Sequence, residues 1–199
     1  MKKILVVVDM QNDFITGPLG TREAVAIVDK VCEKIRGEGW DAIVATMDTH
    51  YTDYFNTQEG KKLPVEHCIY RSHGWCLNPN IADELSGKYI SFCKSTFGCM
   101  GLMELMDHEI NDHFEPENEF ELTLVGVCTD ICVISNALLL KAHYPEMRIV
   151  VDASCCAGST PFRHREALDI LRSCQVEIVN DINTVNFLEK HFVMPESEE

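Results

Sequence analysis

The segment 121–140, ELTLVGVCTDICVISNALLL, limits the possible folds more than any other part of the chain. It begins with an apolar run at 122–127 that is rich in β-formers, followed by a Thr-Asp pair of the kind that caps helices. From Ile131 the pattern predicts a helix, and Cys132 lies in its first turn. A strand, a tight turn and a helix in this order are typical of α/β proteins.

A cysteine at the start of a helix is a candidate nucleophile. Unpaired backbone N–H groups and the helix dipole stabilise a thiolate there, so the sequence predicts a lowered pKa for Cys132. The same N–H groups can bind the oxyanion that forms when a thiolate attacks a carbonyl. The alternative is a packing role, because the chain has 10 cysteines and free cysteine is among the most buried residue types. Cys128, at the end of the predicted strand, is expected to pack.

Charge and hydropathy argue against several classes of protein. A formal net charge of −15 disfavours nucleic acid and anionic membrane surfaces as partners. No apolar run in the sequence has the length of a transmembrane helix. The opening MKKILVVVDM is basic and then apolar, but Asp9 interrupts the run after residues 4–8. We therefore expect a strand at this point and not a targeting segment.

The cysteines are expected to be reduced thiols. The chain is not short and has the composition of a core-rich globular protein, so a disulfide framework is not needed for stability. No pair of cysteines has the C-x-x-C spacing that structural zinc sites, iron–sulfur sites and redox-active thiol pairs use. These observations predict a cytoplasmic protein and disfavour a thiol redox function.

Apolar runs alternate with helical patterns along the whole chain, which predicts a single α/β domain over residues 1–199. We expect a three-layer α/β/α sandwich with a six-stranded parallel sheet in the order 3-2-1-4-5-6. The expected strands are 3–8, 41–47, 88–93, 122–127, 147–152 and 175–180, and the expected helices are 22–36, 79–86, 98–111, a helix from 131, 161–173 and 181–192.

Three reactive side chains follow predicted strands, two of them directly. In the order 3-2-1-4-5-6 the first and fourth strands are neighbours, so Asp9 and Cys132 should lie side by side where ligands bind in open α/β sheets. Lys94 follows the third strand, and an ammonium group there could act on the thiol. The alternatives are a turn acid at Asp9 and a solvated strand-end charge at Lys94.

A second group of polar residues follows the strand 41–47. Asp48 and His50 are two residues apart in extended chain, so their side chains can converge on one metal ion. The long segment that follows is expected to be a loop, and it carries Glu59, His67 and His73. The alternative is that Asp48 caps the next helix and His67 is an ordinary loop residue.

Together these segments resemble the isochorismatase-like cysteine hydrolases, and within them the nicotinamidase group. VVVDMQNDF resembles the signature strand of the family, FCKSTF its lysine segment and GVCTDICV its nucleophile motif. DTH and TQEGKKLPVEHC resemble the metal-binding segment of nicotinamidases. The resemblance covers about residues 3–180, and the separated segments agree in order.

The resemblance implies a catalytic triad of Asp9, Lys94 and Cys132. Asp9 would take the thiol proton, Lys94 would hold the pair electrostatically, and the thiolate would attack an amide carbonyl. Ammonia would leave, and water would hydrolyse the thioester. The backbone N–H groups of Cys128 and Cys132 would form the oxyanion hole, with a cis peptide between Val127 and Cys128.

The resemblance also implies a divalent metal held by Asp48, His50 and His67, with Glu59 as a further ligand. We expect zinc, although iron and manganese also suit these donors. The expected substrate is a small amide, with nicotinamide as the best candidate, which would be hydrolysed to nicotinate and ammonia. The expected assembly is a homo-oligomer.

One position departs from the nicotinamidase pattern. The tryptophan that many nicotinamidases carry three residues before the last metal histidine is replaced here by Pro64. Phe14 is expected to form one aromatic wall for the substrate, and Trp75 or Tyr54 could supply another. The alternatives are therefore hydrolysis of another small amide or ureido acid, an isochorismatase activity, or a catalytically silent binding module on the same fold.

Overall fold

The computed structural model describes residues 1–37, 39–113 and 116–181. A six-stranded sheet in the order β3-β2-β1-β4-β5-β6 forms its centre, and every pair of neighbouring strands is parallel. This confirms the predicted architecture. The strands are β1 (Lys2–Val8), β2 (Ala42–Asp48), β3 (Ile90–Lys94), β4 (Phe120–Val127), β5 (Arg148–Ala157) and β6 (Glu177–Val179).

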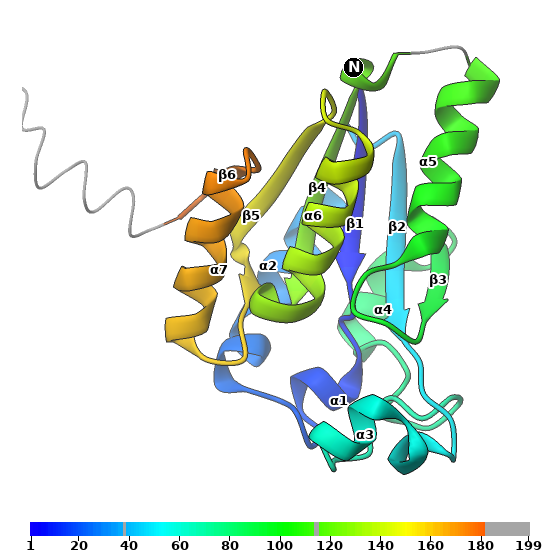
Figure 1. Ribbon diagram of the computed structural model, residues 1–199, viewed down its shortest axis with the longest axis vertical. Helices are drawn as coiled ribbons and strands as arrows, with labels where there is room; N and C mark the ends of the chain where they lie inside the picture. The colour runs from blue at the N-terminus through cyan, green and yellow to red at the C-terminus, as the bar shows by residue number, and fades with distance from the viewer. Residues whose placement is uncertain (38, 114–115, 182–199) are drawn as a thin grey trace, which may run out of the picture.

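Helices cover both faces of the sheet (Figure 1). They are α1 (Asn12–Ile15), α2 (Arg22–Arg36), α3 (Gln58–Lys62), α4 (Pro79–Leu85), α5 (Met100–His113), α6 (Ile134–His143) and α7 (Pro161–Ser173), with short helical turns at Tyr54–Asn56, Glu117–Glu119 and Thr129–Val133. No helix among the described residues is long and apolar enough to cross a lipid bilayer.

The two faces hold two separate hydrophobic cores, because side chains alternate along each buried strand. In β1, Ile4, Val6 and Val8 pack on the face that α5, α6 and α7 cover. Leu5 and Val7 pack on the opposite face, against residues of α2 and α4. The continuous apolar run in the sequence is thus explained by burial on both sides.

The strand register aligns the residues that end each strand. Val8 pairs with Thr46 of β2 and with Gly126 of β4, and Asp48 pairs with Lys94 of β3. Gly126 has φ of 120°, and a Cβ on it would lie 2.1 Å from the carbonyl oxygen of Val8, so only glycine fits this close approach. The ends of β1, β2, β3 and β4 therefore lie together at one edge of the sheet.

Three details differ from the sequence expectations, and one prediction is not tested. The segment after β2 is not a plain loop, because Thr57 accepts a hydrogen bond from the backbone N–H of Gly60 and starts the short helix α3. A π-helical turn at Thr129–Val133 precedes α6, which begins at Ile134 and not at Ile131. β5 continues to Ala157, because a register shift in β4 lets its last residues pair again. The predicted helix 181–192 lies outside the described residues from 182 onward.

Candidate active site

Asp9, Lys94 and Cys132 meet at the carboxyl ends of the strands. Asp9 follows β1 with a positive φ of 50°, Lys94 ends β3, and Cys132 lies in the turn after β4. The Lys94 Nζ lies 2.7 Å from Asp9 Oδ2 and 3.6 Å from the Cys132 Sγ. All three are buried, with exposed fractions of 0% for Asp9, 6% for Lys94 and 5% for Cys132. The structure therefore brings together the residues that the sequence predicted as a group.

Burial and mutual charge decide the protonation of this group. Burial alone would lower the pKa of Lys94, but the Asp9 carboxylate, Cys132 and Asp48 outweigh it and raise that pKa, so Lys94 is a cation. Burial raises the pKa of Asp9, and the charge of Lys94 offsets part of the rise. A cation thus lies against the carboxylate in a site that water barely reaches.

The predicted low pKa of Cys132 is wrong. Burial and the Asp9 carboxylate raise the pKa of the Cys132 thiol well above its usual value. The start of a helix lowers the pKa of a thiol only moderately, and here the loss of hydration on burial outweighs this effect. The thiol therefore keeps its proton at rest, with a carboxylate beside it as acceptor. Burial likewise raises the pKa of Cys128 to about 12, and this half-buried side chain packs against the core on the α2 face, in agreement with the packing role expected for it.

The turn after β4 is held by hydrogen bonds on its inner side. The backbone N–H groups of Ile131 and Val133 both donate to the carbonyl oxygen of Cys128. The Asn136 side chain donates to the carbonyl oxygen of Cys132 at 2.8 Å. The peptide between Val127 and Cys128 is cis, as the family resemblance implied.

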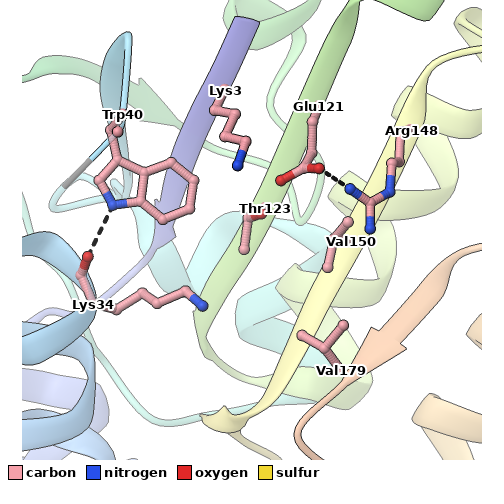
Figure 2. Close-up of a pocket in the computed structure, with 9 residues that line it drawn as sticks. Lys3, Lys34, Trp40, Glu121, Thr123, Arg148, Val150 and Val179 are labelled. Carbon is pink, nitrogen blue, oxygen red and sulfur yellow. Dashed lines mark hydrogen bonds and ion pairs between the residues drawn. The ribbon is translucent and has the colours of Figure 1, made fainter. Parts of the chain in front are cut away.

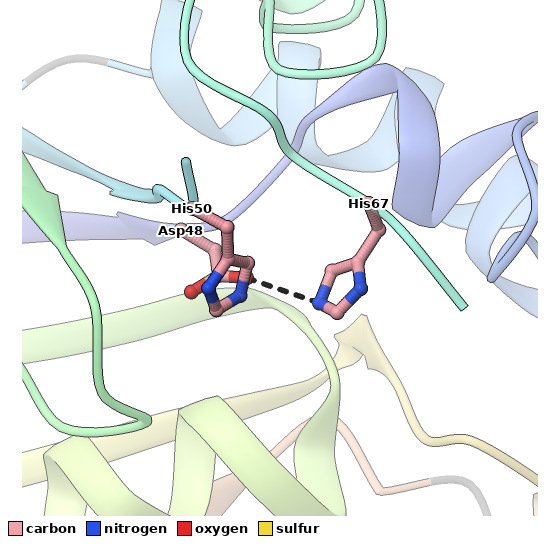
Figure 3. A group of neighbouring side chains, drawn as sticks. All are labelled: Asp48, His50 and His67. Atoms are coloured by element: carbon pink, nitrogen blue, oxygen red, sulfur yellow. Dashed lines mark ion pairs between the residues drawn. The ribbon is translucent and has the colours of Figure 1, made fainter. Parts of the chain in front are cut away.

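Asp48, His50 and His67 form a second group next to the first (Figure 3). The Asp48 Oδ2 lies 3.0 Å from His50 Nε2 and 3.4 Å from His67 Nε2. Glu59, from α3, reaches the same point, with its Oε1 3.7 Å from His50 Nε2 and 3.6 Å from His67 Nε2. His73, which the same segment carries, is exposed and is not part of this group.

The donor atoms of this second group suit a divalent metal ion. The His67 Nδ1 donates to the carbonyl oxygen of Val65 at 2.8 Å, which leaves its Nε2 as a lone-pair donor. The His50 Nε2 is buried and makes no hydrogen bond to any described residue. Metal–ligand bonds of about 2.1 Å separate neighbouring ligand atoms by roughly 3 to 3.5 Å, which agrees with the observed spacing. Two imidazole nitrogens and carboxylate oxygens converging in this way fit a zinc-like ion.

Lys94 joins the two groups, because its Nζ also lies 3.6 Å from Asp48 Oδ1.

Two residues that support these groups were not predicted from the sequence. The Thr46 hydroxyl donates to Asp9 Oδ1 at 2.7 Å, and the buried Gln11 side chain exchanges two hydrogen bonds with the backbone of Asp48. Thr46 could have been found from its spacing, since it is two residues before Asp48 and faces the same side of β2.

The aromatic residues expected at the site have different surroundings. The Phe14 ring lies 5.5 Å from the His67 ring, next to the second group. Tyr54 is wholly buried, packs edge-on against His50 and His67, and donates its hydroxyl to a backbone carbonyl, so it supports the imidazoles. The Trp75 indole N–H donates to the Thr49 hydroxyl at 2.9 Å.

Comparisons with known proteins give a consistent result. The nicotinamidase of Schizosaccharomyces pombe is 26% identical to this chain over 217 residues, which covers 89% of this chain and 92% of that protein. A pyrazinamidase of Pyrococcus horikoshii, solved in complex with zinc, superposes with a TM-score of 0.75 at 24% identity, over 91% of this chain and 100% of that one. An N-carbamoylsarcosine amidase from Thermoplasma acidophilum superposes with a TM-score of 0.69 at 25% identity, over 89% of this chain and 95% of that one.

The family itself follows from the sequence model of the isochorismatase domain, which matches residues 3–181. That range includes all of the sheet except Lys2, and every residue of both groups described above. The chain therefore belongs to the isochorismatase family.

Proposed function

We propose that this chain is an amidohydrolase that converts nicotinamide and water to nicotinate and ammonia. The observation that supports this most strongly is the contact of Lys94 with Asp9, with Cys132 and with Asp48. The buried Lys94 cation thus lies next to the protonated thiol of Cys132, to the Asp9 carboxylate that can accept its proton, and to Asp48 of the group that suits a metal ion. The similarity to the S. pombe nicotinamidase supports the choice of substrate.

Cys132 is the proposed nucleophile. As the sulfur attacks the amide carbonyl, its proton moves to the Asp9 carboxylate, and the cation of Lys94 stabilises the negative charge that develops. The backbone N–H groups of Cys128 and Cys132 bind the oxyanion of the tetrahedral intermediate. Asp9 returns the proton to the leaving nitrogen, the C–N bond breaks, and ammonia departs. Water then cleaves the thioester, with Asp9 as the base, and releases the carboxylic acid.

Asp48, His50, His67 and Glu59 are the proposed ligands of a divalent metal, with zinc favoured by the mixed nitrogen and oxygen donors and iron or manganese as alternatives. When bound, that ion would supply a Lewis acid for the pyridine nitrogen and so orient the ring. Phe14, beside His67, would form one wall of the ring site. Covalent chemistry stays with Cys132, and the second group positions the substrate.

A small ureido acid is the second candidate substrate. Pro64 is exposed and takes the position where many nicotinamidases have a tryptophan, so the aromatic wall of a pyridine site is incomplete at this point. The similarity to an N-carbamoylsarcosine amidase supports the same alternative. Both substrates would use the same attack on a carbonyl carbon by Cys132.

The test is ammonia release from nicotinamide and from N-carbamoylsarcosine, measured with the wild type and with Cys132→Ala. Nicotinamide is expected to have the higher kcat/KM, and the variant is expected to be inactive on both. Ammonia release from N-carbamoylsarcosine alone would move the assignment to the second candidate. Ammonia release from neither, by a protein that is folded and loaded with metal, would contradict an amidase function.

All 10 cysteines are free thiols in the structure, which agrees with the reducing environment of the cytoplasm. We infer a cytoplasmic enzyme on this ground.

A homo-oligomer is also proposed, and light scattering coupled to size-exclusion chromatography would test it.

A further inference from the structure

The turn that carries Cys132 is held on its outer side by the segment that starts α7. The Asp130 carboxylate accepts a hydrogen bond from the backbone N–H of Ser159 at 2.7 Å and another from the Ser159 hydroxyl at 2.6 Å. The Thr129 hydroxyl and the His164 Nδ1 lie 2.8 Å apart. These are side-chain contacts between residues 29 and 35 positions apart, so they fix the turn relative to a different helix.

His164 has little freedom to move away from Thr129. It lies in the first turn of α7, where its backbone N–H donates to the carbonyl oxygen of Thr160. A Cβ on Gly158 would lie 2.9 Å from the His164 Cα, Cβ and backbone nitrogen, so the chain before α7 packs directly against this residue. Thr129 is fully buried, so its hydroxyl must find its partner within the protein.

The imidazole is suited to a fixed, uncharged role. Burial lowers the pKa of His164, and the nearby Arg165 lowers it further against the opposite effect of Asp181 and Asp130. A neutral ring offers Nδ1 to Thr129 either as donor or as acceptor, so the hydrogen bond forms with either tautomer.

Thr129 lies between the two peptide groups that the proposed mechanism uses. The N–H of Cys128 precedes it and the N–H of Cys132 follows it, and the carbonyl oxygen of Thr129 accepts a hydrogen bond from the backbone N–H of Ile134. A shift of Thr129 would move both donors relative to the thiol. Donors of this kind act only when they are already aimed at the oxyanion.

We infer that His164 is a positioning residue, which acts through the Thr129 hydroxyl to hold the Cys128–Cys132 turn in the geometry that binds the oxyanion. The inference rests on the proposed function, because it assigns a role within that reaction. His164 itself does not touch the reacting atoms. Its removal is therefore expected to change kcat and to leave substrate binding almost unchanged.

The experiment compares His164→Leu, which cannot hydrogen-bond, with His164→Asn, whose amide can occupy the position of Nδ1. His164→Leu is expected to lower kcat for nicotinamide about tenfold with KM within about twofold, because oxyanion binding is weakened and ground-state binding is not. His164→Asn is expected to restore kcat to within about threefold of the wild type. The matched control is His143→Leu, an exposed histidine at the end of α6, which is expected to leave kcat unchanged.

A double-mutant cycle with Thr129→Val tests the route of the effect. If both side chains act through one hydrogen bond, Thr129→Val/His164→Leu should be no slower than either single variant. Additive losses, an unchanged kcat in His164→Leu, or a His164→Asn as slow as His164→Leu would each overturn the inference. If His164→Leu does not fold, Thr129→Ser, which keeps the hydroxyl, is compared with Thr129→Val, which removes it. Equal kcat values for these two variants would also overturn the inference.

Hydrogen exchange of the backbone separates failure of this inference from failure of the proposed function. Peptides that span residues 128–133 are expected to exchange about tenfold faster in His164→Leu than in the wild type, while peptides of β1 and β2 do not change. This readout needs no substrate. If the wild type releases no ammonia, equal exchange in the two proteins still overturns the inference, and faster exchange confined to 128–133 supports it.

Discussion

At the amino ends of β1, β4 and β5 the sheet carries a pocket of charged side chains, and at the carboxyl ends it carries the group of Asp9, Lys94 and Cys132. The amino-end pocket has a volume of about 290 Å³ (Figure 2). It is lined by Lys3, Lys34, Gly39, Trp40, Glu121, Thr123, Arg148, Val150 and Val179. Both regions hold basic and acidic side chains, and they differ in how those charges are paired.

In the amino-end pocket Arg148 and Lys34 each pair with carboxylates. Arg148 forms an ion pair with Glu121 and a two-bond pair with Glu177 at 2.9 and 2.8 Å. Lys34 forms an ion pair with Asp152 at 2.8 Å. Each of these pairs joins a carboxylate to one dedicated cation, so both partners keep their ordinary charge states and the pair stabilises the fold.

At the carboxyl ends one buried cation faces several acidic groups at once. Lys94 contacts Asp9, Asp48 and Cys132, and the His50 Nε2 beside them makes no hydrogen bond to any described residue. Convergent and incompletely paired buried groups of this kind cost stability and are found at reactive sites. We therefore expect the amino end of the sheet to contribute stability and the carboxyl end to carry the proposed chemistry.

The largest expected effect is at Asp9. Asp9→Asn removes the proton acceptor and keeps the shape of the side chain, so kcat for nicotinamide should fall by roughly 10³-fold or more. Glu121→Gln is the matched control, since it neutralises a buried carboxylate in the amino-end pocket. Steady-state ammonia release measures both. Activity of Asp9→Asn within tenfold of the wild type, or an equal loss in Glu121→Gln, would remove the distinction between the two ends.

The next effect concerns the metal. The double variant His50→Ala/His67→Ala should lose bound metal and raise KM for nicotinamide by at least 10–100-fold, because the ring is no longer held in place. Alkylation of Cys132 by iodoacetamide should proceed nearly as in the wild type. His73→Ala is the control, an exposed histidine of the same segment. Metal analysis of the purified proteins decides the question, and equal metal content in the double variant and the wild type would refute the site.

The smallest effect is expected near the amino-end pocket. Burial raises the pKa of Asp152, but hydrogen bonds from Lys34 and Ser154 outweigh burial and lower it. A lowered pKa in the folded state contributes stability above the unfolded pKa of about 4, and this contribution is lost as the pH falls through the folded pKa. Lys34→Met should therefore cost about 2 kcal/mol at pH 7, with a smaller difference below pH 4 and unchanged kcat.

Urea unfolding of Lys34→Met at several pH values measures this effect. Lys30→Met, an exposed lysine of the same helix, is the control and should unfold like the wild type. A difference that grows as the pH falls would show that Asp152 is not the group that Lys34 stabilises.

The sequence predicts features that depend on neighbouring residues in one strand. The apolar run of β1 followed by Asp9, and the spacing of Asp48 and His50, led directly to groups that the structure brings together. The sheet order then placed Asp9 and Cys132 side by side, because parallel α/β folds use few topologies.

Other features depend on packing that no local pattern contains. The pKa of Cys132 is set by burial against Asp9, and a helix-start motif does not reveal how deep a side chain will lie. The contact of Thr129, in the π-helical turn, with His164 joins segments that are 35 positions apart in the sequence. No role was expected for His164 from the sequence, and only the fold places it against the turn.

The most direct test of the account is to identify the atom that carries the acyl group during turnover. Wild-type protein mixed with nicotinamide and quenched in acid within milliseconds should contain a nicotinoyl thioester, and fragmentation of the peptide should locate it on Cys132. Cys128→Ala should form the same adduct, since it keeps the backbone N–H. An adduct on Cys128, or wild-type rates of ammonia release by Cys132→Ala, would contradict the account.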